Sequence, residues 1–239
     1  MKLQLILSYD GSRFLGSATQ PHQNSVQDKL QEALKHLGIF KKPLFASRTD
    51  KGVHALSNVA SIECGKHFKD LNELKNKLNF HTKPFIYIKK IQQTSKDFQV
   101  RFSAQKRVYL YAFNHSYFKP NLAAYYHFYP KFDILKAKRA LKLFEGEHDF
   151  AFFKKGEVDK NTLRTIFSTR VFAFKNLSVF RFEANGFLRA QIRLSVAAIL
   201  KLLENKLSLE ELKAQIDKRA IYTRSLAPAS GLYLSKVIY

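Results

Sequence analysis

The chain of 239 residues carries 41 lysines and arginines against 19 acidic residues, which gives a formal net charge of +22. Its single cysteine, Cys64, excludes an internal disulfide and a multi-cysteine zinc site, and no apolar run reaches the roughly 18 residues that a membrane helix needs. We therefore expect a cytoplasmic, globular protein that has no metal and binds a polyanion, nucleic acid before membrane. Nucleotide bias in the genome is an alternative source of the many lysines.

The first part of the chain mixes strands with a helix. Residues 3–9 alternate as a half-buried strand does, and Asp10-Gly11-Ser12 ends that strand as a turn. Ser25 and Asp28 resemble a capping box, so a helix begins there, and Gly38 suits the position after its last turn. Short strands are also predicted at 43–46, 57–63 and 85–91.

After Ser103 the order of strands and helices begins again. We predict a strand at 107–113, a helix at 134–145 ended by Gly146, paired strands at 166–174 and 177–184, a helix at 187–204, a helix from Ser208 and a strand at 232–237. Both parts combine strands with helices. The order of elements therefore predicts a two-lobed α+β protein with lobes at 1–103 and 104–239.

The segment Arg48-Thr49-Asp50-Lys51-Gly52 permits two interpretations. Asp-Lys-Gly between two apolar runs is a common hairpin connection, which would make it only a turn. An arginine two residues before an aspartate is also suited to holding a carboxylate ionised in a cleft. Spacing alone leaves both interpretations open.

A series of motifs in a fixed order resembles the tRNA pseudouridine synthase A family. The matching segments are Tyr9-Asp10-Gly11-Ser12, Ser25-Val26-Gln27, Arg48-Thr49-Asp50, Gly52-Val53-His54-Ala55, Arg101-Phe102-Ser103-Ala104, Arg107-Val108-Tyr109, Gly146-Glu147-His148-Asp149-Phe150, Asn185-Gly186-Phe187-Leu188-Arg189, Arg193 and Gly231-Leu232-Tyr233-Leu234. Their order and spacing agree over essentially the whole chain.

The resemblance implies a fold and a reaction. The fold would be a mixed, mainly antiparallel sheet with helices on the outside and a central RNA-binding cleft. The reaction would be the isomerisation of uridine to pseudouridine in the anticodon stem-loop of tRNA, at positions thirty-eight, thirty-nine and forty, without cofactor or metal. The protein would work as a homodimer.

The resemblance also assigns roles to four residues. Asp50 would attack C1′ of the ribose or support the departing uracil, and Tyr109 would stack on the uracil. Arg193 would pair with Asp50, and Arg48 would fill the space that the base leaves when it flips out of its stack. Without the resemblance, Tyr109 is an ordinary aromatic residue of a strand, Arg193 is a solvated helix residue and Arg48 caps a turn. Tyr111 faces the same side as Tyr109 and is a weaker candidate.

Some residues depart from the family pattern. Ser17-Ala18 stands where an aromatic residue and a glutamine are usual, and Arg189-Ala190-Gln191 replaces a common His-His-Met. We expect these departures to affect RNA contacts and the choice of target positions, without touching Asp50 or Tyr109.

Two other functions are consistent with parts of the sequence. A non-catalytic RNA-binding module on the same fold would share the charge and the aromatic residues, but it would gain nothing from a carboxylate in a basic cleft. A metal-dependent nuclease would need clustered carboxylates, and only Glu145, Glu147 and Asp149 cluster, at a helix end.

Overall fold

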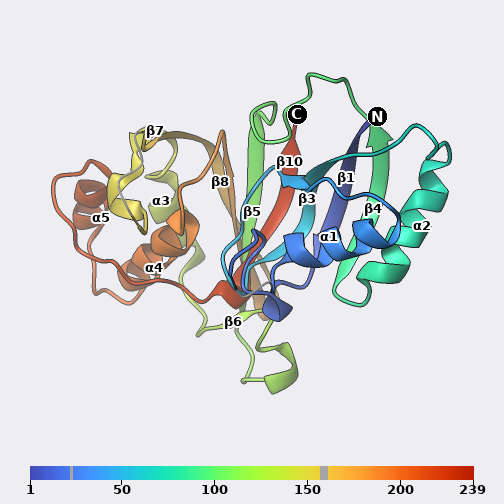
Figure 1. Cartoon of the computed structure of the whole chain (residues 1–239). Coiled ribbons are helices and arrows are strands. Elements are labelled where there is room, and N and C mark those ends of the chain that lie inside the picture. The colour runs from blue at the N-terminus through green and yellow to red at the C-terminus, as the bar shows by residue number, and fades with distance from the viewer. Residues whose placement is uncertain (22–23, 157–160) are drawn as a thin grey trace. The chain divides into compact units, whose positions relative to one another are not determined.

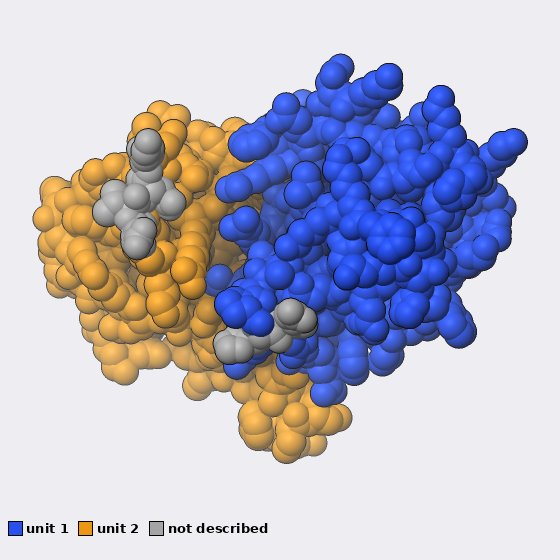
Figure 2. Space-filling model, viewed as in Figure 1, with its two compact units in different colours: residues 1–105, 233–239 blue, residues 106–232 orange. Residues whose placement is uncertain are grey.

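The computed structural model describes residues 1–21, 24–156 and 161–239 of the chain. These residues form two units, which are coloured separately in Figure 2: unit 1 comprises residues 1–105 and 233–239, and unit 2 comprises residues 106–232. The last strand of the chain therefore returns to the unit that the first strand begins.

Unit 1 is built on an antiparallel core to which the C-terminal strand is added. Strand β1 (Lys2–Tyr9) pairs antiparallel with both β3 (His54–Glu63) and β4 (Ile86–Gln93). The short β2 (Leu44–Phe45) pairs with β3, and β10 (Leu232–Ile238) runs parallel to β3.

Two helices complete unit 1 (Figure 1). Helix α1 (Val26–His36) begins at the expected capping box, in which the Ser25 side chain accepts from the backbone N–H of Asp28. Helix α2 (Leu71–Thr82) contacts both α1 and β4. The 3₁₀ turn at Gly11–Arg13 follows β1.

Unit 2 is an antiparallel sheet with helices packed on it. Its strands are β5 (Lys106–Asn114), β6 (His127–Phe128), β7 (Gly146–Asp149), β8 (Leu163–Phe174) and β9 (Leu177–Ala184). The antiparallel order is β5-β9-β8-β7, and β6 lies parallel to β5. Its helices are α3 (Ile134–Lys142), α4 (Gln191–Leu203) and α5 (Leu209–Ile216), with 3₁₀ turns at Pro120–Leu122, Phe150–Phe153 and Ala229–Gly231.

The core of unit 2 is aromatic. Its largest fully buried side chains are Tyr111, Phe113, Phe144, Phe150, Phe153, Phe180 and Phe182. Burying such rings removes a large apolar area from water, which is the main stabilising term for a domain of this size.

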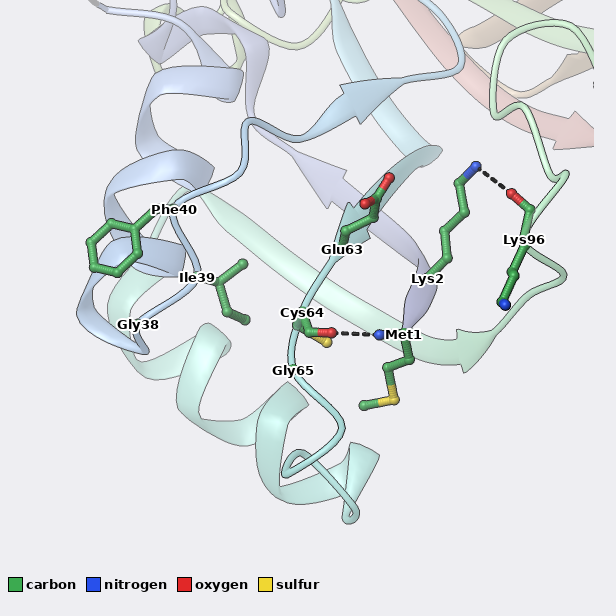
Figure 3. Close-up of a pocket in the computed structure, with 9 residues that line it drawn as sticks. All are labelled: Met1, Lys2, Gly38, Ile39, Phe40, Glu63, Cys64, Gly65 and Lys96. Atoms are coloured by element: carbon green, nitrogen blue, oxygen red, sulfur yellow. Dashed lines mark hydrogen bonds between the residues drawn. The ribbon is translucent and has the colours of Figure 1, made fainter.

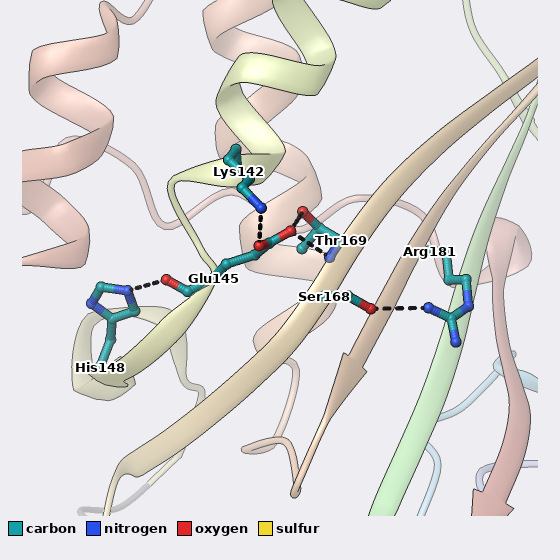
Figure 4. Close-up of polar contacts among 6 residues, drawn as sticks. All are labelled: Lys142, Glu145, His148, Ser168, Thr169 and Arg181. Atoms are coloured by element: carbon teal, nitrogen blue, oxygen red, sulfur yellow. Dashed lines mark hydrogen bonds and ion pairs between the residues drawn. The ribbon is translucent and has the colours of Figure 1, made fainter.

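A carboxylate attaches the end of α3 to the sheet of unit 2 (Figure 4). One Glu145 oxygen accepts from the backbone N–H of Thr169 at 2.9 Å and from its hydroxyl at 3.0 Å, and the other pairs with Lys142. These bonds cross from the helix end to β8.

Two helix predictions need correction, and a further helix was missed. Helix α3 ends at Lys142, before the expected 145, because residues 143–145 make tighter i to i−3 backbone bonds. Helix α4 begins at Gln191, after the expected 187, because Ala190 has a left-handed backbone with φ 62°. Helix α2 was not predicted, although Asp70 caps it and its leucines recur at helical spacing.

Within the described residues, no helix has the length and apolar character needed to cross a bilayer.

Candidate active site

The loop between β2 and β3 carries Arg48 and Asp50 in unit 1. Arg48 is exposed and Asp50 is half-buried. The backbone N–H of Val53 donates to the carbonyl of Asp50 at 3.1 Å, and Gly52 has φ +79° in the region that glycine adopts without strain. The aspartate therefore does sit in a turn, as one of the two interpretations of the sequence predicted.

Thr49, directly before Asp50, is fixed to the protein through three of its atoms. Its backbone N–H donates to Ser17 Oγ at 2.7 Å, and its carbonyl accepts from the backbone N–H of Ser17 at 3.0 Å. Its hydroxyl shares a hydrogen bond of 2.9 Å with the hydroxyl of Tyr9. Because Thr49 is buried and held on both sides, the backbone that leads into Asp50 has a defined position.

Tyr9 is itself held from the other side by Asn58. The amide nitrogen of Asn58 donates to the Tyr9 hydroxyl at 3.2 Å and to the carbonyl of Ser47 at 3.0 Å. Since that hydroxyl accepts from Asn58, its own proton is available for Thr49. Burial raises the pKa of Tyr9 to about 12, so the hydroxyl keeps its proton at neutral pH.

Two glycines allow neighbouring backbone to lie against the aspartate loop. A Cβ added to Gly11 would lie 2.0 Å from the carbonyl oxygen of Val53, and one added to Gly16 would lie 3.0 Å from that of Thr49. Gly16 also has φ +117°. The Gly11 N–H donates to Nδ1 of His54 at 3.1 Å, and the His54 ring stacks on Tyr233 of β10. The segment after β1 thus supports the loop that carries Asp50.

The departure from the family pattern at Ser17 has a structural role next to the aspartate loop. Ser17 was expected to affect RNA contacts without touching Asp50, and it bonds Thr49, the neighbour of Asp50, through both its hydroxyl and its backbone. A phenylalanine or tryptophan at this position would have no hydroxyl to accept that bond. Ser17 is therefore part of the support for the loop in this chain.

Tyr109 lies on β5 in unit 2. It is opposite Phe182 of β9, only 7% exposed, and its ring meets the edge of Phe187 at 5.3 Å between centroids. The neighbouring candidate, Tyr111, is fully buried; its hydroxyl donates to the carbonyl of Pro228 at 2.9 Å and lies 3.1 Å from a ring nitrogen of His127. The hydroxyl of Tyr111 is thus engaged inside unit 2.

Arg193 lies in the first turn of α4, also in unit 2. Its Nε donates to the carbonyl of Ala227 at 2.7 Å, and the backbone N–H of Ala227 donates back to the Arg193 carbonyl at 3.1 Å. Burial raises the pKa of Tyr111, and the positive charge of Arg193 opposes that rise. Asp50 and Arg193 belong to different units, so their pairing stays a prediction.

The acidic cluster of unit 2 has structural partners. Glu145 binds Thr169 and Lys142, while Asp149 binds Lys218 and the hydroxyl of Thr162. Glu147 accepts from a threonine hydroxyl on β8 at 3.3 Å. In the part of the chain that the structure describes, no three acidic, histidine or cysteine side chains group as metal ligands would.

Comparison with known proteins shows which family this chain resembles. The family model described as tRNA pseudouridine synthase matches residues 5–103 and 140–239. Proteins named tRNA pseudouridine synthase A are similar to this chain: one from Campylobacter jejuni is 55% identical over 100% of both chains. One from Helicobacter pylori is 40% identical over 98% of this chain and 97% of its own length.

Two further matches are more distant. The Wolinella succinogenes protein of the same name is 38% identical over 99% of this chain and 94% of its own length. Among solved structures, a Cbf5-Nop10-Gar1 complex covers 81% of this chain and 44% of the matched chain, with 11% identity and a TM-score of 0.37, a likeness too small to support an argument. The full-length identities and the family match show that this chain belongs to the tRNA pseudouridine synthase family, enzymes that isomerise uridine in tRNA.

Proposed function

We propose that this enzyme converts uridine to pseudouridine in the anticodon stem-loop of tRNA, at positions thirty-eight, thirty-nine and forty, with Asp50 as the nucleophile. The observation that supports this role most directly is the fixed position of Thr49 beside a half-buried Asp50. In a chain with a net charge of +22, a carboxylate supported in this way does not serve phosphate binding, because it repels phosphate. A chemical role accounts for it.

The reaction needs a carboxylate and no electron or phosphate carrier. The bond between N1 of uracil and C1′ of ribose breaks, the uracil turns, and a bond between C5 and C1′ forms, after which C5 loses its proton and N1 gains one. Asp50 would either attack C1′ and form a glycosyl ester, or support the departing uracil in a glycal route. The products contain the same atoms as the substrate in both routes.

The other three residues would act on the flipped nucleotide. We propose that Tyr109 stacks on the uracil and that the positively charged Arg193 pairs with Asp50. The exposed Arg48, two residues before Asp50, would occupy the space left in the RNA stack, a role suited to a planar cation that can also bond phosphate.

Replacing Asp50 by Asn tests the central assignment. The amide keeps the size of the side chain and suits the turn before Gly52, but it is a poor nucleophile and carries no charge. Pseudouridine mapped in tRNA incubated with the variant should disappear, while tRNA affinity should stay equal or rise slightly. Glu32→Gln, which removes one exposed negative charge from α1, is the matched control and should keep parental activity.

The same experiment separates the enzyme from a binding module. A binding module would retain tRNA affinity and would form no pseudouridine even in the parent protein. If a folded Asp50→Asn protein forms pseudouridine at a near-parental rate, the assignment of Asp50 is wrong and the residue is only part of a turn.

We further propose that two copies of the chain associate. Support comes from an apolar area on the β8–β9 hairpin: Phe172 pairs with Val179 and Phe174 with Leu177, so these side chains share one face of the sheet. Phe174 is 69% and Phe172 49% exposed. Large exposed apolar areas commonly mark protein interfaces.

The mass in solution, measured by light scattering, tests this association. The parent should have twice the mass of one chain, and Phe174→Lys should lower it at the same concentration. Phe40→Lys, at a residue 74% exposed in unit 1, is the control and should keep the parental mass. A monomeric parent would contradict the proposal.

A further inference from the structure

The segment between β5 and β6, residues 115–126, is here called the aromatic loop (Figure 1). It contains four aromatic residues and one lysine, and no acidic residue. None of its residues is buried, in contrast to the core strand β5 that precedes it. Two of its rings, Tyr117 and Phe118, are exposed. Their exposure forgoes the stabilisation that burial would give, which indicates a contact with a partner.

The base of the aromatic loop is closed by hydrogen bonds. One ring nitrogen of His115 lies 2.8 Å from the carbonyl of Tyr129, and the other lies 2.8 Å from the hydroxyl of Ser178. The Asn114 side chain accepts from both the backbone N–H and the hydroxyl of Ser116, at 2.9 and 2.7 Å. The two ends of the loop are therefore fixed to unit 2.

The tip of the loop is also ordered, and it presents Tyr117 outwards. Lys119 precedes the 3₁₀ turn at Pro120–Leu122, and the Leu122 N–H donates to its carbonyl at 3.0 Å. The Phe118 ring meets the edge of Phe128 at 5.1 Å between centroids. Tyr117, by contrast, is 78% exposed. The ring is thus held out by an ordered backbone, which lowers the entropic cost of using it in binding.

A cation lies against the Tyr117 ring. The ammonium of Lys119 is 4.8 Å from the ring centroid, on one face of the ring. A base would therefore stack on the other face of the Tyr117 ring. An aromatic ring beside a lysine, in a segment without acidic residues, is the combination with which proteins bind single-stranded nucleic acid, where the ring stacks on a base and the cation neutralises a phosphate.

We propose that Tyr117 stacks on an unpaired base of the RNA substrate and that Lys119 neutralises an adjacent phosphate. This proposal rests on the proposed function, because it takes tRNA as the ligand. The loop would be a contact additional to the target uridine, so it would determine affinity for tRNA and leave the chemical step unchanged.

Affinity measurements with a tRNA transcript test the stacking role. Tyr117→Ala should weaken tRNA binding by about 10-fold, as is typical for the loss of one stacked base, and kcat at saturating tRNA should stay parental. Tyr117→Phe keeps the ring and should bind as the parent does. Lys119→Gln should lower the slope of log affinity against log salt by about 1. Phe80→Ala, at a residue 79% exposed on α2, is the matched control and should bind normally.

The absence of tryptophan from the chain permits a direct readout. Tyr117→Trp introduces a single tryptophan, whose fluorescence should be quenched by tRNA as the base stacks on it. Phe80→Trp should show no comparable quenching. The proposal is wrong if Tyr117→Ala binds tRNA as tightly as the parent, or if Phe80→Ala loses as much affinity as Tyr117→Ala does. It is also wrong if Tyr117→Ala changes the mass of the protein in solution, because the loop would then contact protein.

The outcomes also separate this proposal from the proposed function. A parent that forms pseudouridine while Tyr117→Ala binds tRNA normally contradicts only the role of the loop. A parent that binds tRNA through Tyr117 but forms no pseudouridine contradicts only the reaction. A parent that does not bind tRNA contradicts both.

Discussion

The hydroxyl of Tyr9 lies 2.9 Å from the hydroxyl of Thr49, forty residues later in the chain. Tyr9 ends the first strand, and Thr49 directly precedes Asp50, so this bond links the first motif of the sequence to the segment that carries the proposed nucleophile. Both hydroxyls are buried, and a third polar group, the Asn58 amide, completes the set. A buried hydrogen-bond network of this kind fixes the positions of its side chains as long as every polar group in it has a partner.

We predict that Tyr9→Phe destabilises the fold and slows turnover. The change removes the hydroxyl to which both the Thr49 hydroxyl and the Asn58 amide bond. Leaving such buried groups without that partner lowers the free energy of unfolding by about 1–3 kcal/mol. A less fixed Thr49 should lower kcat with little change in KM. Urea unfolding and tRNA kinetics measure both effects, and Tyr87→Phe, at a half-exposed residue, is the control. Parental kcat in a destabilised variant would show that the bond supports only the fold.

A second prediction concerns alkaline pH. Burial raises the pKa of Tyr9 from 10.0 to about 12, so above about pH 10 the unfolded chain loses this proton before the folded chain does. The stability that the group contributes is thus fully present below about pH 10 and is lost as pH rises towards about 12. The difference in unfolding free energy between parent and Tyr9→Phe should therefore shrink from about pH 9 to about pH 11. A constant difference would contradict the raised pKa.

A third prediction concerns Glu145 and acid pH. Burial alone would raise the pKa of this carboxyl, but the bonds from Lys142 and Thr169 outweigh it and hold the pKa below the ordinary value of 4.5 (Figure 4). Its stabilising effect is present above about pH 4.5 and is lost as pH falls through the lowered pKa. Glu145→Gln should destabilise the protein near neutral pH, and its difference from the parent should narrow in acid. Glu32→Gln, at an exposed residue of α1, is the control and should leave stability near neutral pH close to that of the parent.

Local signals in the sequence predicted several elements well. Ser25 and Ser208 both form the capping boxes that their spacing predicts, and the turn at Lys175 joins the two predicted strands of the hairpin. These features depend on residues within three or four positions of each other. The helix at 71–82 could have been predicted in the same way from its Asp70 cap.

Long-range relationships could not be predicted from the sequence. The bonds of Ser17 and Tyr9 to Thr49 join residues 32 and 40 positions apart, and nothing in the spacing indicates them. The strand at the C-terminus was predicted, but its parallel pairing with β3 was not, because periodicity specifies no partner. The start of α4 depends on the left-handed backbone of Ala190, a conformation that alanine does not signal.

A fourth prediction follows from the net charge of +22. Affinity for tRNA should fall steeply with salt, with a log–log slope of roughly −0.7 to −0.9 per phosphate neutralised, because each contact releases a bound counterion. Titrations at several salt concentrations, with magnesium held constant so that the tRNA stays folded, give the slope. A nearly flat dependence would mean that phosphate contacts do not dominate the interface.

The last prediction separates the two functions assigned to Tyr109. Phe at this position retains the ring and its edge contact with Phe187 but loses the hydroxyl, whereas Leu loses both. Leu should therefore bind the flipped uridine less well than Phe does, and both should turn over more slowly than the parent. Single-turnover rates and KM for tRNA distinguish weaker stacking from slower chemistry.

Tyr111→Phe provides the control for Tyr109. The Tyr111 hydroxyl bonds Pro228 within unit 2, so its loss should lower the free energy of unfolding and leave turnover near parental. The Tyr109 variants should show the opposite pattern, with a larger effect on turnover than on the free energy of unfolding. Turnover is corrected for the fraction of unfolded protein, which is measured on the same samples. If Tyr109→Phe and Tyr109→Leu both turn over at the parental rate, Tyr109 is only a residue of the β5 strand, and its assignment to the active site is wrong.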